Sequence, residues 1–153
     1  MMSLSQISAQ VFVGSSPKDI GDVRELFEKH RITSVVNLQT DADLSVRKIN
    51  IDLLKKHYQQ RNIRFARFAI DDVDPVDMAK KIAHPIQYLI EQVTLGEIVY
   101  VHCNAGICRA TSTVLGYLYV YEGLDLNEGL RLIRSKRPIA NPYVEAVREA
   151  LEQ

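Results

Sequence analysis

The sequence predicts an α/β fold with a central, mostly parallel sheet flanked by helices on both faces. Short apolar runs rich in β-branched residues alternate with segments in which apolar residues recur at helical spacing. The last third of the chain keeps the helical spacing without a further strand pattern. Because no internal repeat and no break in composition divides the chain, we expect a single domain over residues 1–153.

The first half of the chain holds three of the expected strands. Residues 10–14 (QVFVG) form the first, and Ser16 and Pro17 suit the cap and first position of the helix that follows. Residues 32–38 (ITSVVNL) form a buried strand. A second helix, marked by apolar positions from Val46 to Leu54, leads to an alternating strand at residues 63–70.

The second half holds one strand and the remaining helices. A third helix is expected from Val76 to Val93, and Pro85 inside it predicts a kink. Residues 98–101 (IVYV) form the most uniformly apolar strand. A helix starting near Ala110 and ending at Gly123 comes next, followed by two shorter helices at about residues 126–135 and 142–151.

Composition excludes several classes of protein. The chain is 46% hydrophobic and 25% charged, which is typical of a globular domain. Lys plus Arg and Asp plus Glu are each 19, so no bulk positive field favours nucleic acid or a membrane surface. No apolar run reaches the ~18 residues of a membrane span, and residues 1–10 lack the pattern of a signal peptide. We expect a cytoplasmic monomer that uses no cofactor and, since its histidines lack ligand spacing, no metal.

The segment 102–109 carries the chemistry of the chain. It lies between the apolar strand and a helix, where backbone N–H groups and the positive helix end form a cradle for a tetrahedral dianion. Gly106 permits the backbone conformation that such a cradle needs. Cys103 stands at its mouth, where a thiolate is favoured, and Arg109 supplies a planar fork for two phosphate oxygens.

This Cys-x5-Arg motif, preceded by His102, resembles the signature of cysteine-dependent protein tyrosine and dual-specificity phosphatases. The resemblance implies a dual-specificity phosphatase-like fold and a metal-independent phosphomonoester hydrolase that works through a phosphocysteine on Cys103. It also implies that Arg109 and the loop amides bind the phosphate of the substrate, the loop residues being Asn104, Ala105, Gly106, Ile107 and Cys108. His102 is expected to hold the loop in place rather than to act as a base.

The mechanism of this family needs a general acid on a separate loop, because the leaving alkoxide must be protonated. Residues 71–75 (DDVDP) follow the third expected strand and so lie at the same edge of the sheet. Asp72 stands 31 positions before Cys103, close to the usual interval in dual-specificity phosphatases, and is the acid that we predict. Asp71 and Asp74 are better explained as a loop cap or as solvated carboxylates.

The substrate is either a phosphorylated protein or a phosphoglucan. Segments 13–17, 36–41, 72–75 and 135–138 are similar to plant glucan phosphatases of the starch-excess type, and the similarity spans nearly the whole chain. Those enzymes typically have an aromatic residue after the acid, whereas this chain has Val73 there and no Trp. We therefore place the dual-specificity protein phosphatase first and the glucan enzyme second. A phosphate- or phosphopeptide-binding module with little turnover is the alternative of another class.

Three further features near the loop leave alternatives open. Cys108 is either a packing residue or a redox partner of Cys103, since low-molecular-weight tyrosine phosphatases have a similar Cys-x4-Cys-Arg loop. Ala110 stands where many tyrosine phosphatases have the hydroxyl that assists hydrolysis of the phosphocysteine, so a slower second step is expected unless Thr111 substitutes. A basic cluster near the carboxyl end is either a solvated helix face or a guide for acidic substrates; it comprises Arg131, Arg134, Lys136 and Arg137.

Overall fold

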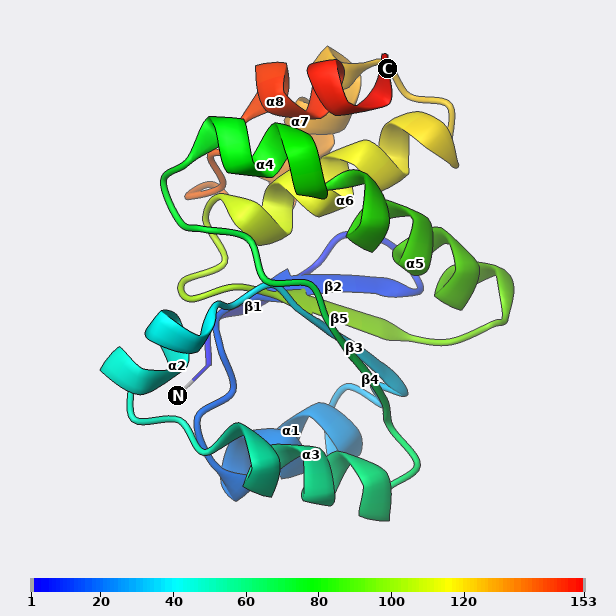
Figure 1. Ribbon diagram of the computed structural model, residues 1–153. Helices are drawn as coiled ribbons and strands as arrows, with labels where there is room; N and C mark the ends of the chain where they lie inside the picture. The colour runs from blue at the N-terminus through cyan, green and yellow to red at the C-terminus, as the bar shows by residue number, and fades with distance from the viewer. Residues whose placement is uncertain (1, 153) are drawn as a thin grey trace.

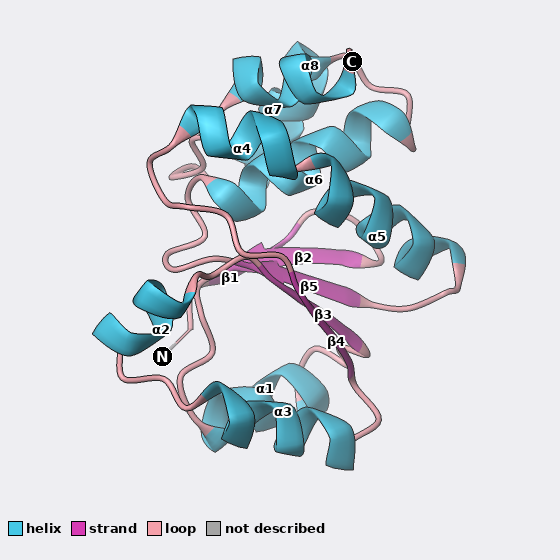
Figure 2. Cartoon of the chain, in the orientation of Figure 1, coloured by secondary structure: helices cyan, strands magenta, loops and turns pink. Residues whose placement is uncertain are grey.

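The structure is a computed structural model that describes residues 2–152. Its centre is a five-stranded sheet with the order β1-β2-β5-β3-β4 (Figure 2). The strands are β1 (Leu4–Gln6), β2 (Val11–Gly14), β3 (Ser34–Asn37), β4 (Arg64–Arg67) and β5 (Val99–His102). The last four pair in parallel and β1 pairs antiparallel with β2. The predicted mostly parallel sheet is therefore confirmed, with β1 as an additional strand.

Helices cover both faces of this sheet, as predicted (Figure 1). On one face lie α1 (Ile20–Glu28) and α3 (Ile51–Gln60), and on the other lie α5 (Ala83–Thr94) and α6 (Arg109–Val120). An outer layer beside α6 consists of α4 (Pro75–Lys81), α7 (Leu126–Lys136) and α8 (Val144–Leu151). The short α2 (Asp41–Val46) follows β3 at the edge of the sheet.

Side chains that alternate in direction along the strands divide the hydrophobic core between the two faces of the sheet. Phe12, Val35 and Tyr100 pack with residues of α1 and α3, whereas their strand neighbours pack with α5 and α6. Burial of each such side chain stabilises the fold by about 1.5–3 kcal/mol. The central strands are covered on both sides, which explains why β5 is apolar at successive positions.

Two predicted helix starts were wrong. The first helix begins at Ile20, because the Asp19 side chain accepts a hydrogen bond from the Asp22 N–H and caps it. Ser16 is buried against the loop after β5 instead of capping a helix. The second expected helix is two helices, since the chain leaves the helical conformation after α2 and Asn50 caps α3.

The disruption predicted near Pro85 is present, as a boundary between two helices rather than as a kink in one helix. The segment from Val76 to Val93 breaks at Ile82, between α4 and α5. Pro85 lies in the first turn of α5, where a backbone N–H has no partner within the helix, so proline does not disrupt it.

Within residues 2–152, no helix is long and apolar enough to cross a membrane.

Parallel pairing brings the carboxyl ends of four strands to one edge of the sheet. The loops that leave this edge are residues 15–19 after β2, 38–40 after β3, 68–74 after β4 and 103–108 after β5. Ligand sites of open α/β sheets lie at this edge. All the predicted site residues fall in these loops or at the first residue of α6.

Candidate active site

In the loop between β5 and α6, the carbonyl groups of residues 104–107 are hydrogen-bonded to other segments of the chain. Each of four successive carbonyls accepts a hydrogen bond from another part of the chain. The donors are Ser16 N–H to Asn104 (3.0 Å), Arg137 Nη2 to Ala105 (2.9 Å), Arg137 Nε to Gly106 (2.7 Å) and Asn141 N–H to Ile107 (2.7 Å). A trans peptide directs its N–H opposite to its C=O, so the N–H groups of residues 105–108 turn the other way. No hydrogen bond within residues 2–152 occupies these four N–H groups, which together form an anion cradle.

Gly106 is required by this geometry for two reasons. Its φ of 70° lies in the left-handed region that glycine adopts without strain. A Cβ at this position would also collide with the backbone of Gly14. The loop and the end of β2 therefore approach each other more closely than any larger residue permits.

Cys103 is a buried free cysteine at the beginning of the loop. The opposite end of the loop leads into α6, whose N-cap residue Cys108 makes no side-chain capping bond. The first N–H groups of α6 are consequently left for another acceptor, and the helix dipole adds positive potential there. A bound anion is favoured in this position.

Arg109 is the first residue of α6 and is completely buried. Its Nη1 donates to Asp43 Oδ2 at 2.7 Å and to the Ile70 carbonyl at 2.8 Å. Its Nε and Nη2 are buried without a hydrogen-bond partner in the part of the chain that the structure describes. Buried donors are nearly always bonded, and Nε with Nη2 forms one edge of the guanidinium fork. The only ion-pair contact of this edge within residues 2–152 is a long one, 3.5 Å between Nε and Asp72 Oδ1, and the shape of the fork matches two oxygens of a phosphate.

Asp43 is a site residue that the sequence analysis missed. Its Oδ2 accepts from Arg109, and its Oδ1 accepts from Asn104 Nδ2 at 2.9 Å. Burial acts to raise the pKa of Asp43, but hydrogen bonds from Arg109, Thr40 and Asn104 outweigh it and hold the pKa well below its usual range. The one local signal is a capping box in which Thr40 and Asp43 bond reciprocally at the start of α2, and this signal alone indicates a helix start.

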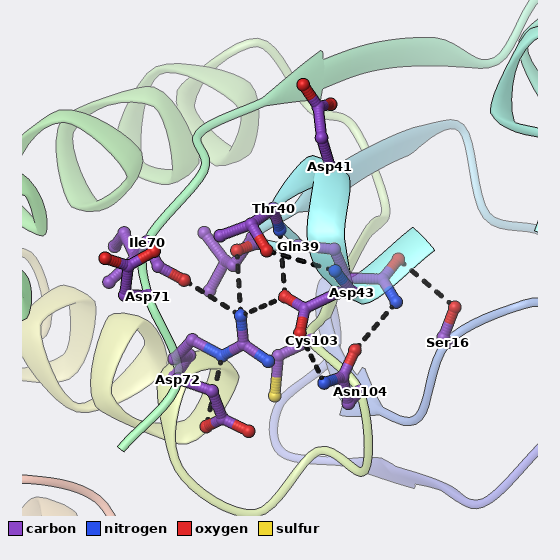
Figure 3. A network of polar contacts seen from close by, with 12 residues as sticks. Ser16, Gln39, Thr40, Asp41, Asp43, Ile70, Asp71, Asp72, Cys103 and Asn104 are labelled. Carbon is purple, nitrogen blue, oxygen red and sulfur yellow. Dashed lines mark hydrogen bonds and ion pairs between the residues drawn. The ribbon is translucent and has the colours of Figure 1, made fainter. Parts of the chain in front are cut away.

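Side chains from three loops form a hydrogen-bonded chain that ends on this carboxylate (Figure 3). Ser16 Oγ donates to Gln39 Oε1 at 3.2 Å, and Gln39 Nε2 donates to Asn104 Oδ1 at 2.9 Å. Asn104 then donates to Asp43, which holds Arg109. Asp41 points away from this network in Figure 3 and pairs instead with Arg67 at 2.8 Å. The network thus fixes the loop after β5 relative to the loops after β2 and β3.

Asp72 lies on the open side of the cradle. Its side chain is 45% exposed, and its Oδ1 lies 3.5 Å from Arg109 Nε. Asp74 accepts from the Asp77 N–H at 3.0 Å as the N-cap of α4, with Pro75 as the first residue of that helix. Among the three aspartates of this loop, Asp72 is the one that contacts Arg109. The structure therefore places Asp72 beside Arg109, and both Asp72 and Cys103 lie close enough to Cys108 to act on the pKa of its thiol.

His102 is buried at the end of β5. Burial lowers its pKa to about 4, the charge of Arg109 acts in the same direction, and a hydrogen bond to the Cys103 carbonyl acts against both. Since a carbonyl only accepts, the ring Nδ1 at 3.2 Å carries the proton of this hydrogen bond. A neutral, buried imidazole suits the predicted loop-holding role.

Cys108 and Thr111 lie where α6 begins. Cys108 is half-buried, and burial, followed by the proximity of Cys103 and Asp72, raises the pKa of its thiol to about 11. The Thr111 hydroxyl donates to the Ile107 carbonyl at 2.6 Å and to the Cys108 carbonyl at 3.1 Å. The Thr111 hydroxyl proton is therefore directed to the loop backbone, so Thr111 does not substitute for the hydroxyl that Ala110 lacks.

The basic cluster near the carboxyl end separates into two kinds of residue. Arg131, Arg134 and Lys136 are exposed, as expected for a solvated helix face. Arg137 is buried and donates to two loop carbonyls. Both interpretations of the cluster from sequence were wrong for Arg137, because neither foresaw a buried guanidinium behind the loop.

Comparisons with known proteins agree with this architecture. The chain is 27% identical over 127 residues to the dual specificity protein phosphatase Mpk3 of Drosophila melanogaster, a match covering 83% of this chain and 28% of that protein. It is 28% identical over 149 residues to the phosphoglucan phosphatase DSP4, amyloplastic, of Castanea sativa, covering 94% of this chain and 38% of that protein. The chain therefore spans less than half the length of these relatives.

A solved structure and a family model complete the comparison. The crystal structure of PTPMT1 superimposes with a TM-score of 0.80 at 20% identity, covering 98% of this chain and 92% of that chain, which shows the same fold. The family model "Dual specificity phosphatase, catalytic domain" matches residues 11–152, from β2 through the loop that holds Cys103 and Arg109 to the end of α8. The chain belongs to the dual specificity phosphatase family.

Proposed function

We propose that this domain is a metal-independent phosphomonoester hydrolase of dual-specificity type. The observation that carries the proposal is the pair of buried donors on Arg109, Nε and Nη2, which form no hydrogen bond within residues 2–152, in the same site as the free thiol of Cys103. With the inward N–H groups of residues 105–108, these donors match the oxygens of a tetrahedral dianion. Charge that develops on the phosphoryl oxygens is then stabilised by the protein itself.

In the proposed reaction, the Cys103 thiolate attacks phosphorus, forming an S–P bond as the P–O bond to the leaving group breaks. Asp72 protonates the leaving oxygen, and its position on the open side of the cradle supports this role. The Asp72 carboxylate then takes a proton from water, whose oxygen attacks phosphorus and releases the thiolate and inorganic phosphate.

Phosphatase activity is tested with p-nitrophenyl phosphate in the presence of EDTA. Wild-type protein should release p-nitrophenolate with many turnovers, and Cys103→Ser should abolish release. Asp41→Asn is the matched control, because Asp41 is 96% exposed and points away from the cradle. A single burst of one phenolate per chain with no further turnover would instead favour a phosphate-binding module.

We propose a phosphorylated protein as the first substrate and a phosphoglucan as the second. Val73 and Ile107, the exposed apolar side chains beside Asp72 and in the loop, are aliphatic, and the chain has no Trp to stack on sugar rings. The similarity to a phosphoglucan phosphatase over 94% of this chain favours the second candidate. Phosphate release from phosphopeptides and from solubilised phosphoglucan, measured side by side, decides between them.

The proposed setting is the cytoplasm, with the domain acting as a monomer. Two free cysteines are typical of a reducing compartment. Every residue in the proposed mechanism comes from one chain, so the chemistry needs no second copy. Light scattering at working concentration tests the monomer, and a dimer whose dissociation abolishes activity would contradict it.

A further inference from the structure

Arg137 follows α7 and extends its side chain underneath the loop of the candidate site. It is only 3% exposed, although it is an arginine. Nε donates to the Gly106 carbonyl at 2.7 Å, Nη2 to the Ala105 carbonyl at 2.9 Å and Nη1 to Ser5 Oγ at 3.1 Å. All three guanidinium nitrogens are thus bonded, and two of them bond to the loop.

The charge of Arg137 has no carboxylate partner. No ion pair within residues 2–152 includes it, whereas Arg109 is paired with Asp43. Burial lowers the pKa of Arg137, and the nearby Tyr100 and Cys103 act to raise it. An arginine remains protonated at neutral pH even so. A buried cation without a counterion is costly to the fold, so its retention behind the loop calls for a reason other than stability.

The two hydrogen bonds to the loop determine where two N–H groups point. The carbonyls of Ala105 and Gly106 face Arg137, so the N–H groups of Gly106 and Ile107, which share those peptide planes, face the cradle. One rigid guanidinium fork thereby sets two adjacent donors at once. An ammonium group is a single compact charge and does not reproduce this fork.

We propose that Arg137 is a positioning residue of the phosphate site. From behind the loop it orients the Gly106 and Ile107 N–H groups toward the bound dianion and adds an uncompensated positive charge close to it. Arg109 binds phosphate from the open side, and Arg137 acts on phosphate only through the loop. The inference deepens the proposed function and rests on it for the identity of the ligand.

The test is the direct binding of inorganic phosphate, measured by titration calorimetry on the full chain. Arg137→Met removes both carbonyl bonds and the charge, and the dissociation constant for phosphate should rise about tenfold or more, as for the loss of one hydrogen bond to a charged group. Arg131→Met is the matched control, because it removes one positive charge from an exposed position of α7. It should leave the dissociation constant within about twofold, as is usual for an exposed charge.

Three further variants separate the effect of orientation from that of charge and provide a measurement if Arg137→Met does not fold. Arg137→Lys keeps the charge and should give an intermediate dissociation constant, and Ser5→Ala removes only the third hydrogen bond and should bind like wild type. Added guanidinium ion should restore phosphate binding to Arg137→Ala, which a purely structural role does not predict. Thermal unfolding confirms that each protein measured is folded.

Wild-type affinity in Arg137→Lys, and in Arg137→Met where that variant folds, would overturn the inference. Because binding is measured without turnover, that result leaves the proposed phosphatase activity unaffected. Conversely, a chain that binds phosphate through Arg137 but never releases p-nitrophenolate would overturn the proposed function alone.

Discussion

Asp43 Oδ2 accepts a hydrogen bond from Arg109 Nη1 at 2.7 Å, across 66 positions of the sequence. Arg109 is 1% exposed in its side chain and Asp43 is 14% exposed, so the pair is largely shielded from water. Breaking a buried pair by removing one partner leaves an uncompensated charge and typically costs about 3–5 kcal/mol. The carboxylate therefore both stabilises the fold and aims the free edge of the Arg109 fork at the cradle.

The first prediction concerns this carboxylate. Asp43→Ala should lower the free energy of unfolding in urea by about 3–5 kcal/mol, because Arg109 loses its counterion. Asp43→Asn should be more stable than Asp43→Ala. Its kcat/KM for p-nitrophenyl phosphate should nevertheless fall about tenfold or more relative to wild type, because Arg109 loses one charge-assisted hydrogen bond. Asp41→Asn should change both quantities little, and an equal loss in that control would contradict the assignment.

The same carboxylate predicts a pH dependence of stability. Since the folded-state pKa of Asp43 is held below its usual range, its contribution is complete above about pH 4 and is lost as pH falls from there through the folded-state pKa. Urea unfolding of wild type and Asp43→Asn at a series of acidic pH values measures the contribution. The difference between the two proteins should shrink as pH falls, and a constant difference would refute the linkage.

The second prediction distinguishes the roles of the aspartates in the loop after β4. Asp72→Asn should lose most activity on a substrate with a poor leaving group and less on p-nitrophenyl phosphate, because only a poor leaving group needs the proton. Asp74→Asn should stay active, since Asn also caps a helix, while Asp74→Ala should lose about 1 kcal/mol of stability. Greater loss in Asp74→Asn than in Asp72→Asn on the poor leaving group would transfer the acid role to Asp74.

The third prediction concerns the second chemical step. Ala110 provides no hydroxyl, and the Thr111 hydroxyl donates to the Ile107 and Cys108 carbonyls. Hydrolysis of the phosphocysteine should therefore limit turnover, and stopped-flow release of p-nitrophenolate should show a burst. Ala110→Ser should raise the steady-state rate and reduce the burst amplitude. A wild-type trace without a burst would show that the first step is limiting.

The fourth prediction follows from the buried neutral ring of His102. Because its folded-state pKa is about 4, below the unfolded value, the unfolded chain binds more protons between pH 6.5 and 4. Above about pH 6.5 the ring is neutral in both states and the free energy of unfolding is unaffected by it. As pH falls below this value the folded state loses stability, by about 3 kcal/mol at pH 4. The unfolding free energy of His102→Gln should fall less steeply over this range. His84→Gln, altered at an exposed histidine, should follow the wild-type curve.

The fifth prediction is reversible oxidation of the two cysteines. Peroxide converts the Cys103 thiolate to a sulfenic acid, and attack by Cys108 forms the disulfide and releases water. Because the pKa of Cys108 is raised to about 11, disulfide formation should accelerate as pH rises from neutrality. Dithiothreitol should then restore activity to oxidised wild type but not to Cys108→Ser, whose Cys103 over-oxidises. Equal recovery of both proteins would leave Cys108 a packing residue.

The sequence by itself determined the parts of the site that depend on neighbouring residues. The apolar run at 98–101, the loop with Cys103 and Gly106, and Arg109 before a helix are contiguous, and local periodicity indicates where strand becomes helix. The alternation of strands and helices also determined a mostly parallel sheet, which places residues 71–75 at the same edge as Cys103. The helix starts at Ile20 and Ile51 were missed, because several polar residues near each boundary are equally good caps.

Only the tertiary structure decided which distant groups support that loop. Asp43, Ser16, Asn141 and Arg137 lie between 31 and 88 positions from the residues within 104–109 that they bond, and each is a common polar residue in an unremarkable local context. A buried carbonyl or guanidinium must be paired, but its partner depends on which elements pack beside it. Packing of α2 and of the segment after α7 against the loop therefore brings Asp43 to Arg109 and Arg137 to Gly106, a choice that no local spacing encodes.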